Sequence, residues 1–275
     1  LNYFLYINQM GFILSCSTIP SRIDKLIRIL HHTLRTKYKY FIVNVCVDYK
    51  RFGKFQIPKD LIRLCKMERR IIFNIVPDFG PICKYVGAFS IARKIKLNKN
   101  DKIIIIDDDT LYNPDLFYEL LDCKTNDNIT TGSGFNYDEN RNYKIVEGKT
   151  DMVEGYGGVC FGLDQCDAFI MWFVTFYKFF NFKDEDPVSK YLQACFLGDD
   201  FILSNIYPKK FAIKEGRKYI NPQQYGFDQD ALHKNNVFGS NMESYKHLHD
   251  NITILNTFKK KFELNKSICS LGCKN

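Results

Sequence analysis

The chain has 275 residues, of which 45% are hydrophobic and 15% aromatic, and its formal net charge is +8. This composition can build one large hydrophobic core, which excludes an intrinsically disordered protein. Lys and Arg are spread along the chain instead of forming a basic stripe, which argues against nucleic-acid binding and suits a solvated surface or a phosphate-bearing small molecule.

Short apolar runs alternate with amphipathic helical patterns in the first half of the chain, as in βα units that build a parallel sheet. We predict strands at 11–17, 41–47, 71–76 and 102–106. A helix follows the first strand, with Ser21 as its N-cap, and another covers about 82–96. Each predicted strand is followed by polar residues, namely Thr18, Asp48, Asp78 and the cluster Asp107-Asp108-Asp109. Because ligands of open α/β sheets bind beyond the carboxyl ends of strands, we expect these residues to share one edge.

The second half of the chain is less regular. The segments 131–134 and 154–158 are typical of loops or strand edges, and an aromatic helix follows around Trp172. Trp172 could stack on a sugar, but such an aromatic stripe is more often part of a core. Gly198-Asp199-Asp200 is predicted to open another helix, and 211–213 is a candidate strand.

The cysteines indicate a reducing compartment. The chain has ten, and most lie between apolar residues, where a reduced thiol packs as a small hydrophobic group. The sequence contains no Cys-x-x-Cys pair and no histidine cluster beside its cysteines, so it gives no sign of a zinc site. Without a basic leader or an apolar stretch long enough to span a bilayer, the sequence predicts a soluble, cytoplasmic protein with no transmembrane segment.

The acidic cluster carries the clearest chemical signal. Two carboxylates at positions i and i+2 after a buried strand can converge on one hard divalent cation, which in turn binds the phosphates of a nucleotide. Mn²⁺ or Mg²⁺ suits such oxygen ligands. Adjacent aspartates repel one another without a counter-cation, although a solvated turn remains an alternative. Phosphatases and nucleotidyltransferases also place aspartates after strands.

The motifs STIPSR, VCVD, DFGPICK, IIIIDDDTLYNPD, GYGG and GDDFIL follow one another in an order that resembles the GT-A glycosyltransferases of the family 2-like kind, over residues 11–240. The resemblance implies an α/β fold with a mostly parallel central sheet flanked by helices. It also implies a single domain over 1–275, with a nucleotide-sugar-binding half at 1–110, an acceptor and catalytic half at 111–245, and a C-terminal extension at 246–275.

The same resemblance implies roles for individual residues at the donor site. Asp107 and Asp109 would form the DxD motif that holds Mn²⁺ or Mg²⁺, with Asp109 as the direct ligand, while Asp108 would face the ribose or sugar. Contacts to the nucleotide, its phosphates and the donor sugar would come from Thr18, Arg22, Asp48, Asp78, Lys84, Gly157 and Gly158. His233 would complete the metal site, ahead of the weaker candidates His247 and His249. Asp48 and Asp78 could equally be ordinary turn residues, and a lone His233 is more often a surface residue.

Asp199 and Asp200 resemble the xED motif that supplies the general base of inverting enzymes. A carboxylate beside the acceptor can take the proton of the attacking hydroxyl, and we assign this role to Asp200, with Asp199 orienting the acceptor or the loop. Asp199 stands where the family usually has Glu. If both acids only cap the helix N-terminus, a retaining enzyme stays open.

The sequence thus predicts transfer of a sugar from a nucleotide-sugar, a UDP-sugar first, to a hydroxyl of a glycan or glycoconjugate, with inversion. The alternatives are a retaining glycosyltransferase, a sugar-phosphate nucleotidyltransferase and a non-catalytic GT-A-like scaffold. Nucleotidyltransferases usually carry a basic, Gly-rich loop after the first strand, which STIPSR lacks. No nucleic-acid partner is expected, and a homo-oligomer is left open.

Overall fold

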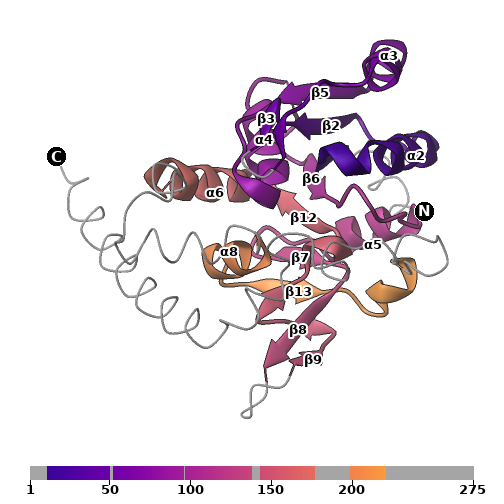
Figure 1. Ribbon diagram of the computed structural model, residues 1–275. Helices are drawn as coiled ribbons and strands as arrows, with labels where there is room; N and C mark the ends of the chain where they lie inside the picture. The colour runs from indigo at the N-terminus through magenta and orange to yellow at the C-terminus, as the bar shows by residue number, and fades with distance from the viewer. Residues whose placement is uncertain (1–10, 50–51, 96, 138–142, 177–198, 221–275) are drawn as a thin grey trace.

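The computed structural model describes residues 11–49, 52–95, 97–137, 143–176 and 199–220 (Figure 1). Within these ranges the protein is a mixed α/β structure built on an eight-stranded sheet, in the order β10-β13-β7-β12-β6-β1-β2-β5. A three-stranded sheet, β11-β8-β9, and a short hairpin, β3-β4, accompany it. The predicted fold class, a mostly parallel central sheet flanked by helices, is confirmed.

The first half of the chain forms βα units, as the sequence pattern predicts. Its elements are β1 (Phe12–Ser17), η1 (Pro20–Arg22), α2 (Ile23–Thr33), β2 (Tyr40–Val45), β3 (Asp48–Tyr49), β4 (Gly53–Lys54), α3 (Lys59–Met67), β5 (Ile71–Ile75), η2 (Gly80–Ile82), α4 (Cys83–Ala92) and β6 (Lys102–Ile105). The strands β6, β1, β2 and β5 are mutually parallel neighbours. Their carboxyl ends therefore meet at one edge of the sheet.

The second half extends the same sheet with antiparallel and parallel pairs. Its elements are α5 (Asp115–Cys123), β7 (Ile129–Thr131), β8 (Gly134–Tyr137), β9 (Tyr143–Ile145), β10 (Gly148–Lys149), β11 (Met152–Val153), η3 (Gly155–Gly157), β12 (Val159–Gly162), α6 (Leu163–Phe176), α8 (Asp199–Ile206), β13 (Lys210–Ala212) and η5 (Gly216–Tyr219). β12 is antiparallel to both β6 and β7, and β13 is parallel to β7. β12 therefore joins the two halves of the sheet.

Alternation along the buried strands divides the core between the two faces of the sheet. In β6, Ile103 and Ile105 belong to one apolar cluster, whereas Ile104 belongs to the other. Successive side chains of a strand point to opposite faces, so a continuous apolar run is buried on both sides. Figure 1 shows α4, α6 and α8 on one side of the sheet and α2 and α5 on the other.

Two local predictions are wrong, and both concern segments that follow strands. Ser21 does not cap a helix, because the chain first makes the 3₁₀ turn η1, and α2 begins after Arg22 without a side-chain cap. Pro20 opens that turn, where its missing N–H and fixed φ are tolerated. The second strand ends at Val45, and Asp48 lies in the separate strand β3, paired with Lys54.

α3 and α5 are helices that the sequence analysis did not predict. Other predicted elements, including α8 and β13, are confirmed with small shifts in their ends. Among the helices in the described ranges, none combines the length and apolar character needed to cross a membrane.

Candidate functional site

Polar residues follow three of the four parallel strands at the edge of the sheet where these strands end, as expected. Thr18 comes directly after β1, Asp78 closely after β5, and Asp107 closely after β6. Thr18 is buried, and its carbonyl oxygen accepts a hydrogen bond of 2.7 Å from the Tyr49 hydroxyl. Asp48, by contrast, is exposed in its hairpin. The edge therefore contains both buried and solvent-facing groups.

Asp78 belongs to a small buried cluster with Cys46 and Cys83. Its Oδ1 accepts a hydrogen bond of 2.9 Å from the amide of Gly80. The ligand atoms of Asp78, Cys46 and Cys83 lie within 4.8 Å of one another, the one such group of three found in the described part of the chain. However, the Cys83 thiol already donates to the carbonyl of Pro77 at 3.3 Å. A hydrogen bond with Cys46, and then burial, raise the pKa of Cys83 well above its usual value, which favours the neutral thiol over a metal-binding thiolate.

The cluster Asp107-Asp108-Asp109 lies in the turn that follows β6, and Arg22 forms ion pairs with two of its members. Arg22 Nη1 lies 2.9 Å from Asp108 Oδ1, and Arg22 Nη2 lies 2.7 Å from Asp109 Oδ2. Asp108 is buried, and its Oδ2 has no hydrogen-bond partner. Burial raises the pKa of Asp109 to about 6, although Arg22 opposes this shift. The guanidinium thus compensates part of the charge of adjacent carboxylates.

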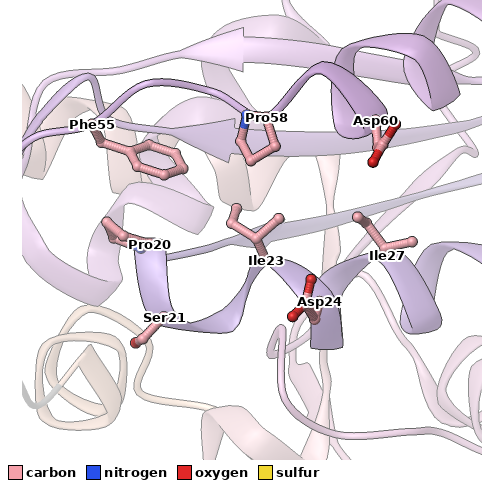
Figure 2. Close-up of a pocket in the computed structure, with 8 residues that line it drawn as sticks. All are labelled: Pro20, Ser21, Ile23, Asp24, Ile27, Phe55, Pro58 and Asp60. Carbon is pink, nitrogen blue, oxygen red and sulfur yellow. The ribbon is translucent and has the colours of Figure 1, made fainter.

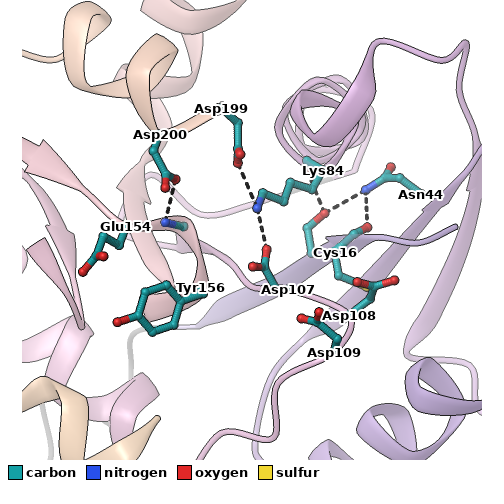
Figure 3. Close-up of polar contacts among 12 residues, drawn as sticks. Cys16, Asn44, Lys84, Asp107, Asp108, Asp109, Glu154, Tyr156, Asp199 and Asp200 are labelled. Carbon is teal, nitrogen blue, oxygen red and sulfur yellow. Dashed lines mark hydrogen bonds and ion pairs between the residues drawn. The ribbon is translucent and has the colours of Figure 1, made fainter. Parts of the chain in front are cut away.

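Lys84, in the first turn of α4, joins Asp107, the member of the cluster that Arg22 does not pair with, to Asp199 in the second half of the chain (Figure 3). Its Nζ lies 2.5 Å from Asp107 Oδ1 and 2.9 Å from Asp199 Oδ2. The lysine is only 4% exposed. Burial lowers the pKa of Lys84, but the carboxylates of Asp107 and Asp199 outweigh it and hold this pKa well above the usual value. Asp107 and Asp199, which are far apart in the sequence, therefore meet at one ammonium group.

Asp200, at the N-terminus of α8 beside Asp199, is held by the glycine loop. Its Oδ1 accepts a hydrogen bond of 2.7 Å from the amide of Gly155. Burial, and then the neighbouring Asp199 carboxylate, raise the pKa of Asp200 well above its usual range. Asp199 and Asp200 thus each contact a group outside α8.

In the glycine loop, which comprises η3 and Gly158, each of three glycines is required for a different structural reason. A Cβ at Gly157 would lie 2.6 Å from the main-chain nitrogen of Ser133, so the close approach is to protein backbone. Gly158 has φ +74°, a conformation that favours glycine. A Cβ at Gly155 would instead lie 2.9 Å from Asp200 Oδ1, within the carboxylate cluster. Sequence reasoning selected Gly157 and Gly158 but missed Gly155, the glycine that faces the acids.

Tyr112 is a second residue that the sequence analysis missed. Its hydroxyl accepts a hydrogen bond of 3.0 Å from the amide of Asp107 and donates one of 2.9 Å to the carbonyl of Tyr156. This buried side chain therefore ties the acidic cluster to the glycine loop. Its position soon after the acidic run was the available signal.

A third missed feature is a chain of buried polar groups beneath α4. Asn74 donates to Asn44 Oδ1 at 2.9 Å, Asn44 donates to Ser15 Oγ at 2.9 Å, and Ser15 donates to the carbonyl of Lys84 at 3.0 Å. A Cβ at Gly87 would lie 1.8 Å from Asn44 Oδ1, so α4 approaches β2 very closely. Asn44 and Ser15 interrupt otherwise apolar strands, which was the signal in the sequence.

Beside Asp200, Glu154 forms a further network with Ser133 and Arg217. Arg217 Nη2 lies 2.7 Å from Glu154 Oε2, and Arg217 Nε donates to Ser133 Oγ at 2.8 Å. The Ser133 hydroxyl also donates to Glu154 Oε2. Figure 3 shows Glu154 and Tyr156 on the same side of the cluster as Asp200. The second half of the chain thus adds polar groups next to the acids at the start of α8.

A separate surface pocket lies between η1 and α2 on one side and the segment that leads into the start of α3 on the other (Figure 2). Its volume is about 260 Å³, and its lining is mainly apolar with two acids, comprising Ile23, Ile27, Phe55, Pro58, Asp24 and Asp60 among others. None of the predicted site residues lines it. The pocket is therefore distinct from the carboxylate cluster.

Asp107 and Asp109 supply hard oxygen donors of the kind that Mg²⁺ and Mn²⁺ prefer. Their side chains are 25% and 15% exposed, so both remain accessible from solvent. Such ions are commonly held by one or two carboxylates together with substrate phosphates and water, so either carboxylate could supply a ligand, although Asp107 is paired with Lys84 and Asp109 with Arg22 in this structure. The predicted third ligand, His233, lies outside the described residues, as do His247 and His249.

No protein-family model and no curated protein matches this sequence. The chain does resemble several solved structures. A 4-diphosphocytidyl-2C-methyl-D-erythritol synthase matches with TM-score 0.39 and 9% identity, over 59% of this chain and 80% of that one. The WbbM bifunctional glycosyltransferase matches with TM-score 0.37 and 13% identity, over 74% of this chain and 38% of that one. The inositol-1-phosphate CTP transferase from T. maritima matches with TM-score 0.32 and 10% identity, over 58% of this chain and 72% of that one.

Proposed function

We propose that this protein transfers a sugar from a nucleotide-sugar, a UDP-sugar, to a hydroxyl group of a glycan or glycoconjugate acceptor. The observation that carries the proposal is the meeting of Asp107 and Asp199 at the ammonium of Lys84. It brings the acids that follow a parallel strand next to the acids that begin α8. One set suits a donor diphosphate, and the other suits an acceptor hydroxyl.

In this proposal Asp107 and Asp109 hold Mn²⁺ or Mg²⁺. The ion would supply positive charge to the diphosphate as it leaves with the electrons of the broken bond. Arg22 lies beside the same carboxylates and limits their mutual repulsion. Thr18, Asp48 and Asp78 mark the edge along which the nucleotide would extend, because nucleotides bind beyond the carboxyl ends of such strands.

Asp200 is proposed as the general base. The acceptor oxygen forms a bond to the anomeric carbon, the bond from that carbon to the diphosphate oxygen breaks, and the acceptor proton passes to a carboxylate oxygen of Asp200. The raised pKa of Asp200 makes its ionised form a stronger proton acceptor than an ordinary aspartate. Attack from the face opposite the leaving group inverts the anomeric configuration. Asp199 is held by Lys84 and would orient the start of α8.

Two other activities remain to be separated from this one by experiment. A sugar-phosphate nucleotidyltransferase would use the same edge for a nucleoside triphosphate and release pyrophosphate. The segment between β1 and α2 contains no glycine and enters η1 at Pro20, which disfavours a flexible phosphate-binding loop. A non-catalytic scaffold would have no use for buried like charges, which are costly to keep together.

The proposal is tested first by thermal unfolding with UDP, GDP and CMP, each with and without Mn²⁺. We expect UDP with Mn²⁺ to raise Tm, and Asp107→Asn to abolish that rise. Asp122→Asn, at an exposed acid on α5, is the matched control and should respond as the wild type does.

Turnover then distinguishes the classes of enzyme. Release of UDP from a UDP-sugar, lost in Asp107→Asn and in Asp200→Asn, would support the proposal. Pyrophosphate release from a nucleoside triphosphate and a sugar phosphate would refute it in favour of the nucleotidyltransferase. No nucleotide response in the full-length protein would favour the scaffold.

A further inference from the structure

In the proposed chemistry Lys84 only holds Asp199, and its contact with Asp107 has no role of its own. The sequence places it near the donor phosphates, but its ammonium is already engaged by Asp107 and Asp199 (Figure 3). Its side chain is 5% exposed, compared with 25% for Asp107. The lysine thus approaches Asp107 from the protein interior, while solvent reaches the same carboxylate from outside.

The main chain that carries Lys84 is firmly placed. The Ser15 hydroxyl binds the Lys84 carbonyl, and Asn44 holds that hydroxyl in turn. The contact between Gly87 and Asn44 leaves no space for α4 to move towards β2. Any change in the position of the ammonium must therefore come from the torsions of the side chain, which is long and flexible.

We propose that Lys84 is the internal counter-cation of the metal site: it neutralises Asp107 in the metal-free protein, releases it when a divalent cation binds, and stays paired with Asp199. This inference rests on the proposed function, because it requires Asp107 to be a metal ligand. Lys84 is then a positioning residue that links the donor carboxylates to the helix carrying Asp200.

Lys84 and its two carboxylate partners place three charges at a largely buried point of the protein. A carboxylate with low exposure is costly to leave unpaired, so Asp107 and Asp199 need a cation before substrate arrives. A unit positive charge in contact with Asp107 also opposes the approach of a second cation to the same oxygen. Lys84 therefore stabilises the metal-free fold and, for the same reason, weakens metal binding.

The discriminating variant is Lys84→Met, which keeps a long side chain and removes the charge. We expect it to bind Mn²⁺ about tenfold more tightly than the wild type, because the competing charge is gone. Without metal its Tm should fall, and Mn²⁺ should raise that Tm by more than it raises the wild-type Tm. Lys84→Arg is the control, since it keeps the charge and should show no gain in affinity.

Binding is measured directly, from the electron paramagnetic resonance signal of free Mn²⁺ during titration of the full chain, with no substrate present. If Lys84→Met does not fold, Lys84→Met combined with Asp199→Asn removes one charge of each sign and is expected to show the same gain. Mn²⁺ affinity equal to or weaker than that of the wild type would overturn the inference and leave the proposed function standing. Absence of Mn²⁺ binding in the wild type and in the variants alike would overturn both.

Discussion

The amide of Gly155 donates a hydrogen bond of 2.7 Å to Oδ1 of Asp200, and this contact joins the glycine loop to the N-terminus of α8. It fixes one oxygen of the carboxylate that we propose as the general base. A Cβ at Gly155 would meet Asp200 Oδ1 at 2.9 Å, Lys84 Nζ at 3.1 Å and Asp199 Oδ2 at 3.3 Å. The absence of a side chain at Gly155 is therefore what allows these three groups to converge.

Gly155→Ala should reduce transfer activity strongly while the protein stays folded. The added methyl group meets the ends of side chains, which can shift, so the loss of stability should be small. The shift moves the carboxylates, and a displacement of about 1 Å at a reacting group can cost on the order of a hundredfold in rate. The measurements are kcat and Tm on the same preparation.

Gly157→Ala provides the contrasting variant in the same loop. Its Cβ would lie 2.6 Å from the Ser133 nitrogen, and backbone cannot yield as a side chain does. This variant should lose stability as well as activity. If Gly155→Ala lowers Tm as much as Gly157→Ala does, the two glycines have the same structural role and our distinction is wrong.

Asp200→Asn should stabilise the protein at neutral pH. Because the pKa of Asp200 is raised in the folded state, the native protein binds its proton more tightly than the unfolded chain does. Stability therefore falls as pH rises from the unfolded pKa, about 4, towards the raised folded value. Asparagine has no charge and so avoids the cost of ionisation in this buried place, and its amide oxygen can still accept the hydrogen bond from the Gly155 amide. Denaturant unfolding of wild type and variant should agree near pH 3 and diverge at pH 7, and a less stable variant at pH 7 would contradict the assignment.

The activity of the wild type should also rise with pH as Asp200 loses its proton, because only the ionised carboxylate can accept one. The profile of kcat against pH should have its acidic limb above the range of an ordinary aspartate. Asp200→Asn should lack this limb along with most of the activity. A flat profile between pH 5 and pH 8 would point to another base.

Asn44→Leu should destabilise the fold, although the two side chains have similar size. The Asn44 amide donates to Ser15 Oγ and to the carbonyl of Cys16, and its Oδ1 accepts from Asn74. Each buried group left without a partner costs about 1–3 kcal/mol, so a total of roughly 3 kcal/mol is expected. Urea unfolding measures the loss, and exposed Asn126→Leu, expected to be close to neutral, is its control. A loss below about 1 kcal/mol would show that the buried chain is dispensable.

Tyr112→Phe should loosen the link between the acidic cluster and the glycine loop. It leaves the Asp107 amide and the Tyr156 carbonyl without their shared partner. We expect a loss of about 1–3 kcal/mol in stability together with weaker stabilisation by UDP and Mn²⁺. Tyr118→Phe, at a partly exposed tyrosine of α5, should change neither quantity. Unchanged nucleotide stabilisation in Tyr112→Phe would mean that the link does not position Asp107.

Much of the first half could be predicted because its information is local. The apolar run before Asp107 is a strand buried on both faces, and the helix-period pattern after Thr18 is an amphipathic helix, so the βα alternation follows from the residues themselves. Parallel strands end at one edge, so the shared position of the residues that follow them was also within reach. The predicted N-cap at Ser21 is wrong because Pro20 permits a 3₁₀ turn where a helix start was expected.

The contacts that define the candidate site were decided by the tertiary structure. Whether Lys84 reaches Asp199, or Gly155 reaches Asp200, depends on how α8 packs beside β11 and how α4 packs on β2. Sequence spacing places no constraint on such pairs, since they belong to separate elements whose separation in space is set by core packing. By itself the sequence determined the four parallel strands of the first half and which acids follow them, because side-chain period and turn chemistry act over a few residues. Only the folded chain decided which cation those acids share, because charge pairing in a buried place depends on distances that arise after the elements have packed.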